Sequence, residues 1–154
     1  PGYLKNKAKR QAVTMPKLQL IDTGLACNIL GIHNEDQLTQ TQYFGGLLEN
    51  LIYMELLKQS TWSDEQITLW HFRDHRQHEV DIVLERDNNK IIGIEVKATS
   101  TLNQHDFNGL MTLAEFNPTQ FQKGIIFYSG KNILSFSRPG VPLFALPIRL
   151  FLTN

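Results

Sequence analysis

The chain has 154 residues, of which 42% are hydrophobic, and its 15 basic and 15 acidic residues give a formal net charge of zero. This length suits one domain with a substantial core, no apolar run is long enough to span a membrane, and the first residues show no signal-peptide pattern. Zero net charge excludes a global electrostatic attraction to nucleic acid, and the single cysteine, Cys27, excludes an internal disulfide and favours the reducing cytoplasm.

The beginning of the chain is basic. Residues 1–21 contain five lysines and arginines and no acidic residue. Such a segment can be an arm that contacts phosphates, or the remainder of a longer chain, since the sequence has no start methionine. We assign residues 1–16 to this arm or remnant and residues 17–154 to the domain.

Two short segments follow. Residues 22–31 predict a short helix that begins at Asp22 or Thr23, both good N-cap residues, and stops at Gly31. Residues 33–42 are polar and are interpreted as a loop that leads into the next helix.

Residues 43–59 give the strongest helical pattern. Its apolar face consists of residues spaced three or four apart, namely Phe44, Leu47, Leu48, Leu51, Ile52 and Leu56. Glu49 lies at the edge of this face, where it could simply be an exposed charge. Glu55 lies close to the middle, where a carboxylate needs a partner. We expect Glu55 to form a structural ion pair or cap, or to contact another domain.

Residues 67–73 predict a strand, and residues 74–78 a polar turn. The histidines at 71, 75 and 78 suggest zinc, but no second pair of ligands stands in a suitable arrangement. The basic tip of this turn could contact a phosphodiester backbone; it consists of Arg73, His75, Arg76 and His78. It could equally be a solvated hairpin loop.

Residues 79–85 and 91–98 alternate apolar and polar side chains and flank an Asp-Asn-Asn turn, the pattern of a β-hairpin. A register that sets residue 86 opposite residue 90 places Asp81 across from Glu95, with Lys97 further along the same face. The alternation also predicts that Val80, Ile82 and Leu84 share the opposite face of their strand.

Carboxylates that face each other on adjacent strands repel. A divalent cation between them removes the repulsion, because Mg²⁺ and Mn²⁺ prefer oxygen ligands. A nearby lysine is suited to orienting a water molecule or stabilising an anionic transition state. Alternatively, these are solvated charges on a surface hairpin and Lys97 neutralises Glu95. The apolar residues around Glu95 and Lys97 favour a central strand, where charges need a reason.

The remaining third of the chain predicts one helix and three strands. Residues 99–101 offer a helix cap, and residues 104–116 form a helix that ends before Pro118. The strands are a buried one at 124–129, another at 132–136 and an edge strand at 141–147, the last interrupted by prolines. Residues 147–152 are apolar and form either a surface for a missing domain or a second copy, or another core strand.

The order of these elements predicts an α/β sandwich, with a mixed sheet flanked by helices. The pattern of Asp81 followed by Glu95-Val96-Lys97 resembles the PD-(D/E)XK signature of restriction-endonuclease-like phosphodiesterases, with Val80 where the signature has proline. A longer string is similar to the uncharacterised C-terminal domain that follows a AAA-type ATPase module in many prokaryotic proteins. That string comprises Gly46-Leu47-Leu48-Glu49, Trp70-His71-Phe72-Arg73, residues 79–85 and Ile94-Glu95-Val96-Lys97.

This resemblance implies a restriction-endonuclease-like αβββαβ fold over residues 17–154 and a metal-dependent phosphodiesterase that acts on DNA or another nucleic acid. Asp81 and Glu95 would bind Mg²⁺ or Mn²⁺, with Glu49 as a third carboxylate, directly or through water, and the Val96 carbonyl as a further ligand. Lys97 would position the attacking water. Thr99 and Gln104 are weaker candidates for supporting the metal ligands.

The alternative is a catalytically silent module that serves an ATPase as a regulatory or partner-binding domain. The expected partners are nucleic acid, a AAA-type ATPase module outside this chain and a second copy in a homodimer. No membrane association is expected.

Overall fold

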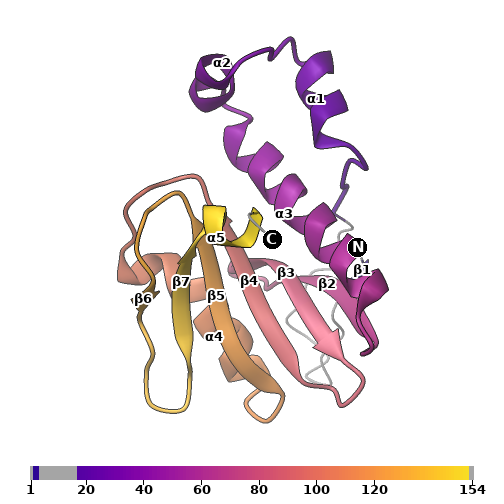
Figure 1. Cartoon of the computed structure of the whole chain (residues 1–154). Coiled ribbons are helices and arrows are strands. Elements are labelled where there is room, and N and C mark those ends of the chain that lie inside the picture. The colour runs from indigo at the N-terminus through magenta and orange to yellow at the C-terminus, as the bar shows by residue number, and fades with distance from the viewer. Residues whose placement is uncertain (1, 4–16, 153–154) are drawn as a thin grey trace.

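A mixed β-sheet forms the centre of the computed structural model, which describes residues 2–3 and 17–152 (Figure 1). Seven strands are present among these residues, in the order β1-β2-β3-β4-β5-β7-β6. Neighbouring strands from β2 to β4 are antiparallel, whereas β4, β5 and β7 run parallel to one another. The strands are β1 (Gly2–Tyr3), β2 (Ile67–Arg73), β3 (Glu79–Arg86), β4 (Ile91–Lys97), β5 (Phe121–Tyr128), β6 (Leu134–Ser135) and β7 (Leu143–Pro147).

Helices cover both faces of this sheet (Figure 1). The long helix α3 (Phe44–Trp62) and the short α5 (Ile148–Leu152) lie on one face, and the 3₁₀ turn η1 (Gln104–Phe107) with α4 (Asn108–Phe116) lies on the other. No helix in residues 17–152 is long and apolar enough to cross a membrane. The predicted mixed α/β sheet flanked by helices is confirmed, as is the order helix, three strands, helix, strand.

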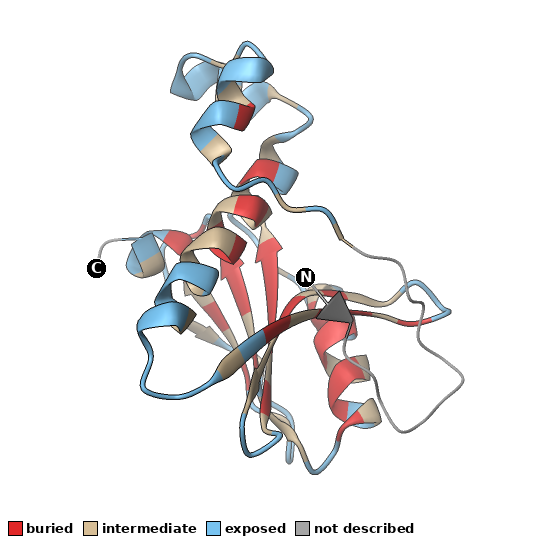
Figure 2. Ribbon diagram, turned by 90° about the vertical axis from the view of Figure 1, so that its right-hand side faces the viewer, coloured by how far each residue is buried: buried red, intermediate tan, exposed pale blue. Residues whose placement is uncertain are grey.

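Each face of the sheet has its own apolar core (Figure 2). On the α3 side, Ile52 packs with Ile82 and Ile94, all with 2% exposure or less. On the α4 side, Leu110 and Leu113 pack over β4 and β5. A methyl group on Gly93 would come within 2.7 Å of Leu110 and 2.9 Å of Leu113, so glycine is needed there for α4 to lie close to the sheet.

A β-bulge in β3 contradicts one prediction about the central hairpin. Trp70 pairs with Val83 and Phe72 pairs with Val80, so two residues of β3, Asp81 and Ile82, stand opposite the single residue between them on β2. Val80 consequently lies in the α4-side core, whereas Ile82 lies in the α3-side core. The expectation that Val80, Ile82 and Leu84 share one face was therefore wrong at Val80.

The N-terminal part of the described chain contains two short helices, α1 (Thr23–Ile29) and α2 (Glu35–Gln40). As predicted, the Asp22 carboxylate caps α1, and Gly31 ends it with a φ of 69°. The prediction of a loop at 33–42 was wrong. The Asn34 side chain accepts a hydrogen bond from the Gln37 N–H, and the acidic residues that follow Asn34 suit the first turn of a helix.

Three expectations for the C-terminal third were also wrong. Asn103 caps the helix instead of residues 99–101, because its side chain and that of Asp106 form a reciprocal capping box. The strand expected at 132–136 shortens to β6. β7 was expected at the edge but lies between β5 and β6. This interior position is tolerated because one proline stands just before β7 and the other is its last residue, so neither interrupts the hydrogen bonds within the strand.

Residues 148–152 form α5, so the alternative of another core strand was wrong. Leu150 and Leu152 are exposed on this helix, and the alternative of a surface for a missing domain or a second copy stays a prediction. Ile148 is buried and the Phe151 ring packs on Phe127 with a centroid distance of 4.9 Å. Glu55 on α3 forms the expected structural ion pair, with its carboxylate 2.6 Å from the Lys58 ammonium.

A candidate metal site where β3 and β4 separate

The predicted hairpin register is confirmed, and it ends at the candidate site. β3 and β4 pair from Glu85 opposite Ile91 to Ile82 opposite Ile94. Beyond that pair the bulge carries β3 away, and Asp81 Oδ2 accepts the Val96 N–H at 2.9 Å in place of a backbone carbonyl. The N–H and C=O of one residue in a strand point to the same edge, so the Val96 carbonyl also points into this gap. We call the gap between Asp81 and Val96 the fork.

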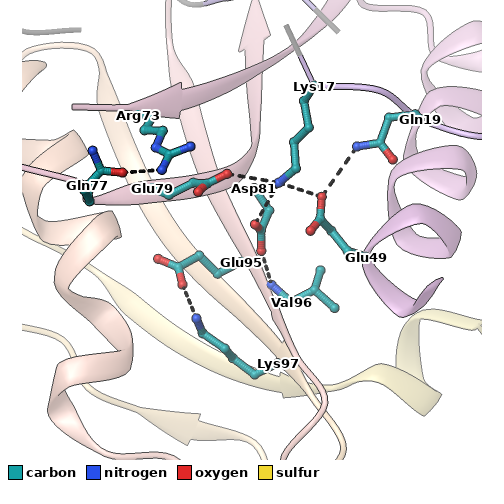
Figure 3. A network of polar contacts seen from close by, with 10 residues as sticks. All are labelled: Lys17, Gln19, Glu49, Arg73, Gln77, Glu79, Asp81, Glu95, Val96 and Lys97. Carbon is teal, nitrogen blue, oxygen red and sulfur yellow. Dashed lines mark hydrogen bonds and ion pairs between the residues drawn. The ribbon is translucent and has the colours of Figure 1, made fainter. Parts of the chain in front are cut away.

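An ammonium group lies on the α3 side of the fork. Lys17 Nζ is 2.7 Å from a Glu49 oxygen, 3.2 Å from Asp81 Oδ1 and 3.3 Å from a Glu79 oxygen (Figure 3). Burial disfavours the charge on Lys17, but the three carboxylates outweigh it and raise the pKa of this lysine. Lys17 is therefore positively charged at neutral pH and offsets part of the charge of the carboxylates.

The segment that carries Lys17 is fixed on α3 by a buried amide. The Asn50 carbonyl oxygen accepts the Leu20 N–H at 2.7 Å, and its NH₂ group donates to the Leu20 carbonyl and to the Thr23 hydroxyl, both at 2.9 Å. Gln19 donates to Glu49 at 3.5 Å. Four contacts thus hold the extended segment beside the helix.

The acid and the lysine of the signature form a pair on the other side of the fork. Lys97 Nζ lies 2.9 Å from Glu95 Oε2, and the Glu95 side chain is only 6% exposed. Glu95 Oε1 is buried and has no hydrogen-bond partner among residues 2–3 and 17–152. A methyl group on Gly109 would lie 2.6 Å from this oxygen, so the absence of a side chain on Gly109 makes room for the carboxylate beneath α4.

The buried position of Glu95 changes its acidity. Burial raises the pKa of Glu95 to about 7; the Lys97 ammonium opposes this shift, and the negative charges of Asp81 and Asp106 add to it. Burial disfavours the charge on Lys97, but Glu95 outweighs it and raises the pKa of Lys97. Near neutral pH Glu95 is therefore protonated in part of the molecules and ionised in the rest. A bound cation could take the place of this proton.

Asp81 connects the two sides of the fork electrostatically. It raises the pKa of Glu49, although burial contributes more to that shift and Lys17 opposes it, and it also raises the pKa of Glu95. In Figure 3 Asp81 lies between these two glutamates. The expectation that Asp81 and Glu95 project from the same face was wrong, because Asp81 contacts Lys17, which pairs with Glu49 on α3, whereas Glu95 lies beside Gly109 of α4. An ion shared by the two carboxylates would therefore lie in the gap between β3 and β4 and not on one face of the sheet.

Thr99, Gln104 and His78, the other candidates from the sequence, have partners or surroundings of their own. Thr99 Oγ1 bonds with the backbone of Thr101, and Gln104 lines a cavity of about 300 Å³ together with Phe107 and Ser135. His78 Nδ1 is 2.9 Å from Asp74 Oδ2. Burial would raise the pKa of Asp74, but the contact with His78 outweighs burial and lowers it. This pair stabilises the turn between β2 and β3.

The oxygen atoms at the fork are of the kind that bind a divalent cation, although they do not form a complete metal site among the residues that the structure describes. Among residues 17–152 no three His, Cys, Asp or Glu side chains form a group that could hold a metal. Asp81, the unpartnered oxygen of Glu95 and the Val96 carbonyl nevertheless offer only oxygen atoms, which Mg²⁺ and Mn²⁺ prefer. A cation at the fork would give the orphaned Glu95 oxygen the partner that it lacks.

Sequence reasoning missed Lys17, Glu79 and Asn50. Asn50 had a usable signal, since it interrupts the apolar face of a predicted helix between Leu47 and Leu51, and a buried amide needs partners. Lys17 had no such signal, because nothing in the basic N-terminal stretch distinguishes it from the other lysines there.

A family model described as "Domain of unknown function (DUF4143)" matches residues 44–151. The chain belongs to this family. The DUF4143 match includes Glu49, Asp81, Glu95 and Lys97, whereas Lys17 and α1 precede it. No curated protein and no solved structure matches the chain.

The raised pKa of Glu95 predicts how the stability of the metal-free domain depends on pH. The folded domain binds this proton more tightly than the unfolded chain, in which the pKa is near 4.5. The free energy of unfolding should therefore fall as the pH rises from about 4.5 to about 7 and stay level above that. Glu95→Gln should remove this loss, because glutamine does not titrate. The free energy of unfolding of Glu95→Gln minus that of the wild type should therefore increase by up to about 3 kcal/mol between about pH 5 and about pH 8.

Urea denaturation in a chelating buffer at these two pH values measures the effect. The change with pH in the difference between wild type and Glu95→Gln isolates this one carboxyl from other titrating groups. A difference that is the same at both pH values would show that Glu95 is not held with a raised pKa.

Proposed function

We propose that this DUF4143 domain is a metal-dependent phosphodiesterase of the restriction-endonuclease-like type and that it hydrolyses nucleic acid, with DNA as the first substrate to test. The observation that carries the proposal is the fork itself. There an aspartate, a buried glutamate with one unpartnered oxygen and a lysine meet at a break in the sheet. The order of elements from α3 to β5 also agrees with the αβββαβ arrangement.

The proposed metal ligands are Asp81, Glu95 and the Val96 carbonyl. A bound Mg²⁺ or Mn²⁺ would polarise the phosphoryl group and lower the pKa of a coordinated water. Glu49 borders the same fork but is ion-paired with Lys17, so we place it outside the direct contacts of the ion. The fork would then hold the ion through two carboxylates and one backbone carbonyl.

Lys97 has two roles in this proposal. Its ammonium group lies beside Glu95 and its side chain is 35% exposed, so a water molecule or a phosphate oxygen can approach this lysine. As a cation next to the reacting phosphorus it would orient the attacking water and offset the negative charge that develops in the transition state. Glu95 would release its proton when the ion binds, because a carboxylate must be ionised to act as a ligand.

Substrate binding must come from local features because the chain carries no net charge. The turn between β2 and β3 carries His75, Arg76 and His78, which line a cavity of about 310 Å³ against α4. This turn leads directly into Glu79 and Asp81, so a phosphate held there would be close to the fork. A AAA-type ATPase module outside this chain could supply further contacts with the substrate.

A catalytically silent module that regulates an ATPase is the second candidate. The observation in its favour is that Lys17 already neutralises part of the acidic cluster without any metal. Under this alternative the fork is a structural ion-pair network, and the domain acts by binding a partner protein.

Cleavage of DNA distinguishes the two candidates. The domain should cut at least one of three labelled substrates (single-stranded, duplex and branched DNA) in Mn²⁺ or Mg²⁺ and none in chelator, and Asp81→Ala should lose the activity. Equal traces of cleavage in the wild type and in Asp81→Ala would indicate a contaminating nuclease and favour the silent module.

A further inference from the structure

The Lys17 ammonium occupies the kind of position that a cation takes in a carboxylate cluster. It contacts three carboxylates from two elements, Glu49 on α3 and Glu79 and Asp81 on β3, at 2.7 to 3.3 Å. Its own side chain is 23% exposed. A surface ion pair usually joins one cation to one anion, and a lysine among three acids is an unusual concentration of partners.

The charge around the fork shows what Lys17 contributes. Glu49, Glu79, Asp81, Glu95 and Asp106 carry five negative charges when ionised, and Lys17 and Lys97 carry two positive charges. One divalent ion reduces the remaining charge of minus three to minus one. Without Lys17 the charge would be minus four, which two divalent ions neutralise, and the side of the fork next to Glu49 would have no cation among the described residues.

Lys17 is not needed to attach its own segment to the domain. Asn50 already binds the backbone of Leu20 on both its N–H and its carbonyl, and it binds the Thr23 hydroxyl as well. The ammonium therefore has a separate role from the attachment. Its partners are all acids of the candidate site, which points to a role in the electrostatics of that site.

We infer that Lys17 is a built-in cation that fills the Glu49 side of the fork and restricts the site to one divalent ion, held on the Glu95 side. This inference rests on the proposed function, because it assumes an ion between Asp81 and Glu95. Two-metal phosphodiesterases use a second ion to stabilise charge on the reacting phosphate. In this domain the ammonium of Lys17 takes the place of that second ion.

The number of Mn²⁺ ions bound per chain tests the inference. Titration calorimetry should find one ion for the wild type and two for Lys17→Met, which keeps the length of the side chain and removes its charge. Lys17→Arg should keep one ion. Lys123→Met on the exposed part of β5 is the matched control and should also keep one. If Lys17→Met binds the same number of ions as the wild type, the inference is wrong.

A second variant keeps the test decisive if Lys17→Met does not fold. Glu49→Gln in the wild-type background should still bind one ion, with an affinity within about threefold of wild type, because Glu49 holds Lys17 and not the ion. A loss of about tenfold or more would make Glu49 a direct ligand and would overturn the inference.

The two proposals fail in different ways. If the wild type binds no ion, the phosphodiesterase proposal loses its metal, and the inference, which assumes that ion, is refuted with it. If the wild type binds one ion through Asp81 and Lys17→Met adds none, the metal site is retained and the role of Lys17 is refuted.

Discussion

Replacing Lys97 with alanine is expected to lower Mn²⁺-dependent DNA cleavage by about 10² to 10³-fold, the usual cost of removing one charged group that stabilises a transition state. The ammonium is the only group of the fork that is both cationic and on the Glu95 side among the described residues. Its loss would leave the attacking water without a fixed partner and the developing charge on phosphorus without compensation.

Metal binding should respond differently to the same substitution. Lys97 competes with an incoming cation for Glu95, so Lys97→Ala should leave Mn²⁺ affinity unchanged or somewhat higher. Lys123→Ala, which removes an exposed lysine from the neighbouring strand β5, is the control and should cleave like the wild type. A Lys97→Ala variant that retains full cleavage would exclude this lysine from the reaction and leave the proposed chemistry without its cation.

The regular parts of the fold could be predicted because periodic patterns report them directly. The helix α3, the strands β3 and β4, and the register that sets Ile82 opposite Ile94 all follow from side-chain spacing and from the turn between the strands. The same register and the family resemblance predicted that Glu49, Asp81 and Glu95 share one site, but no three such side chains form a metal-holding group among the described residues.

The irregular parts could not be predicted because they depend on tertiary contacts. The bulge at Asp81 and Ile82 inserts one extra residue into β3, and a strict period of two cannot represent it. Its consequence is functional, since it separates β3 from β4 and directs Asp81 to the Val96 N–H. Bulges often lie beside active sites for this reason.

Lys17 illustrates a second limit of sequence reasoning. It lies 32 residues before Glu49 and 64 before Asp81, and no local pattern links residues so far apart. The link is made by Asn50, which binds the Leu20 backbone and brings the segment onto α3. A buried asparagine in a helix face signals that partners exist but does not identify them.

Asp81→Ala is expected to abolish Mn²⁺ binding, with an affinity at least about 100-fold below that of the wild type. Asp81 is the side chain that couples both halves of the fork, because it contacts Lys17 on one side and raises the pKa of Glu95 on the other. Removing it deletes one of two carboxylate ligands and frees the Val96 N–H that positions the neighbouring carbonyl. Urea denaturation of the metal-free variant verifies that it is folded.

Calorimetric titration of Mn²⁺ into the wild type, Asp81→Ala and Asp87→Ala is the most direct measurement, with the last variant removing an exposed aspartate from the turn of the same hairpin. We predict that the wild type and Asp87→Ala bind one ion and that Asp81→Ala binds none. A wild-type domain that takes up no Mn²⁺ at millimolar concentration, or an Asp81→Ala variant that binds it as well as the wild type, would contradict a metal site at the fork.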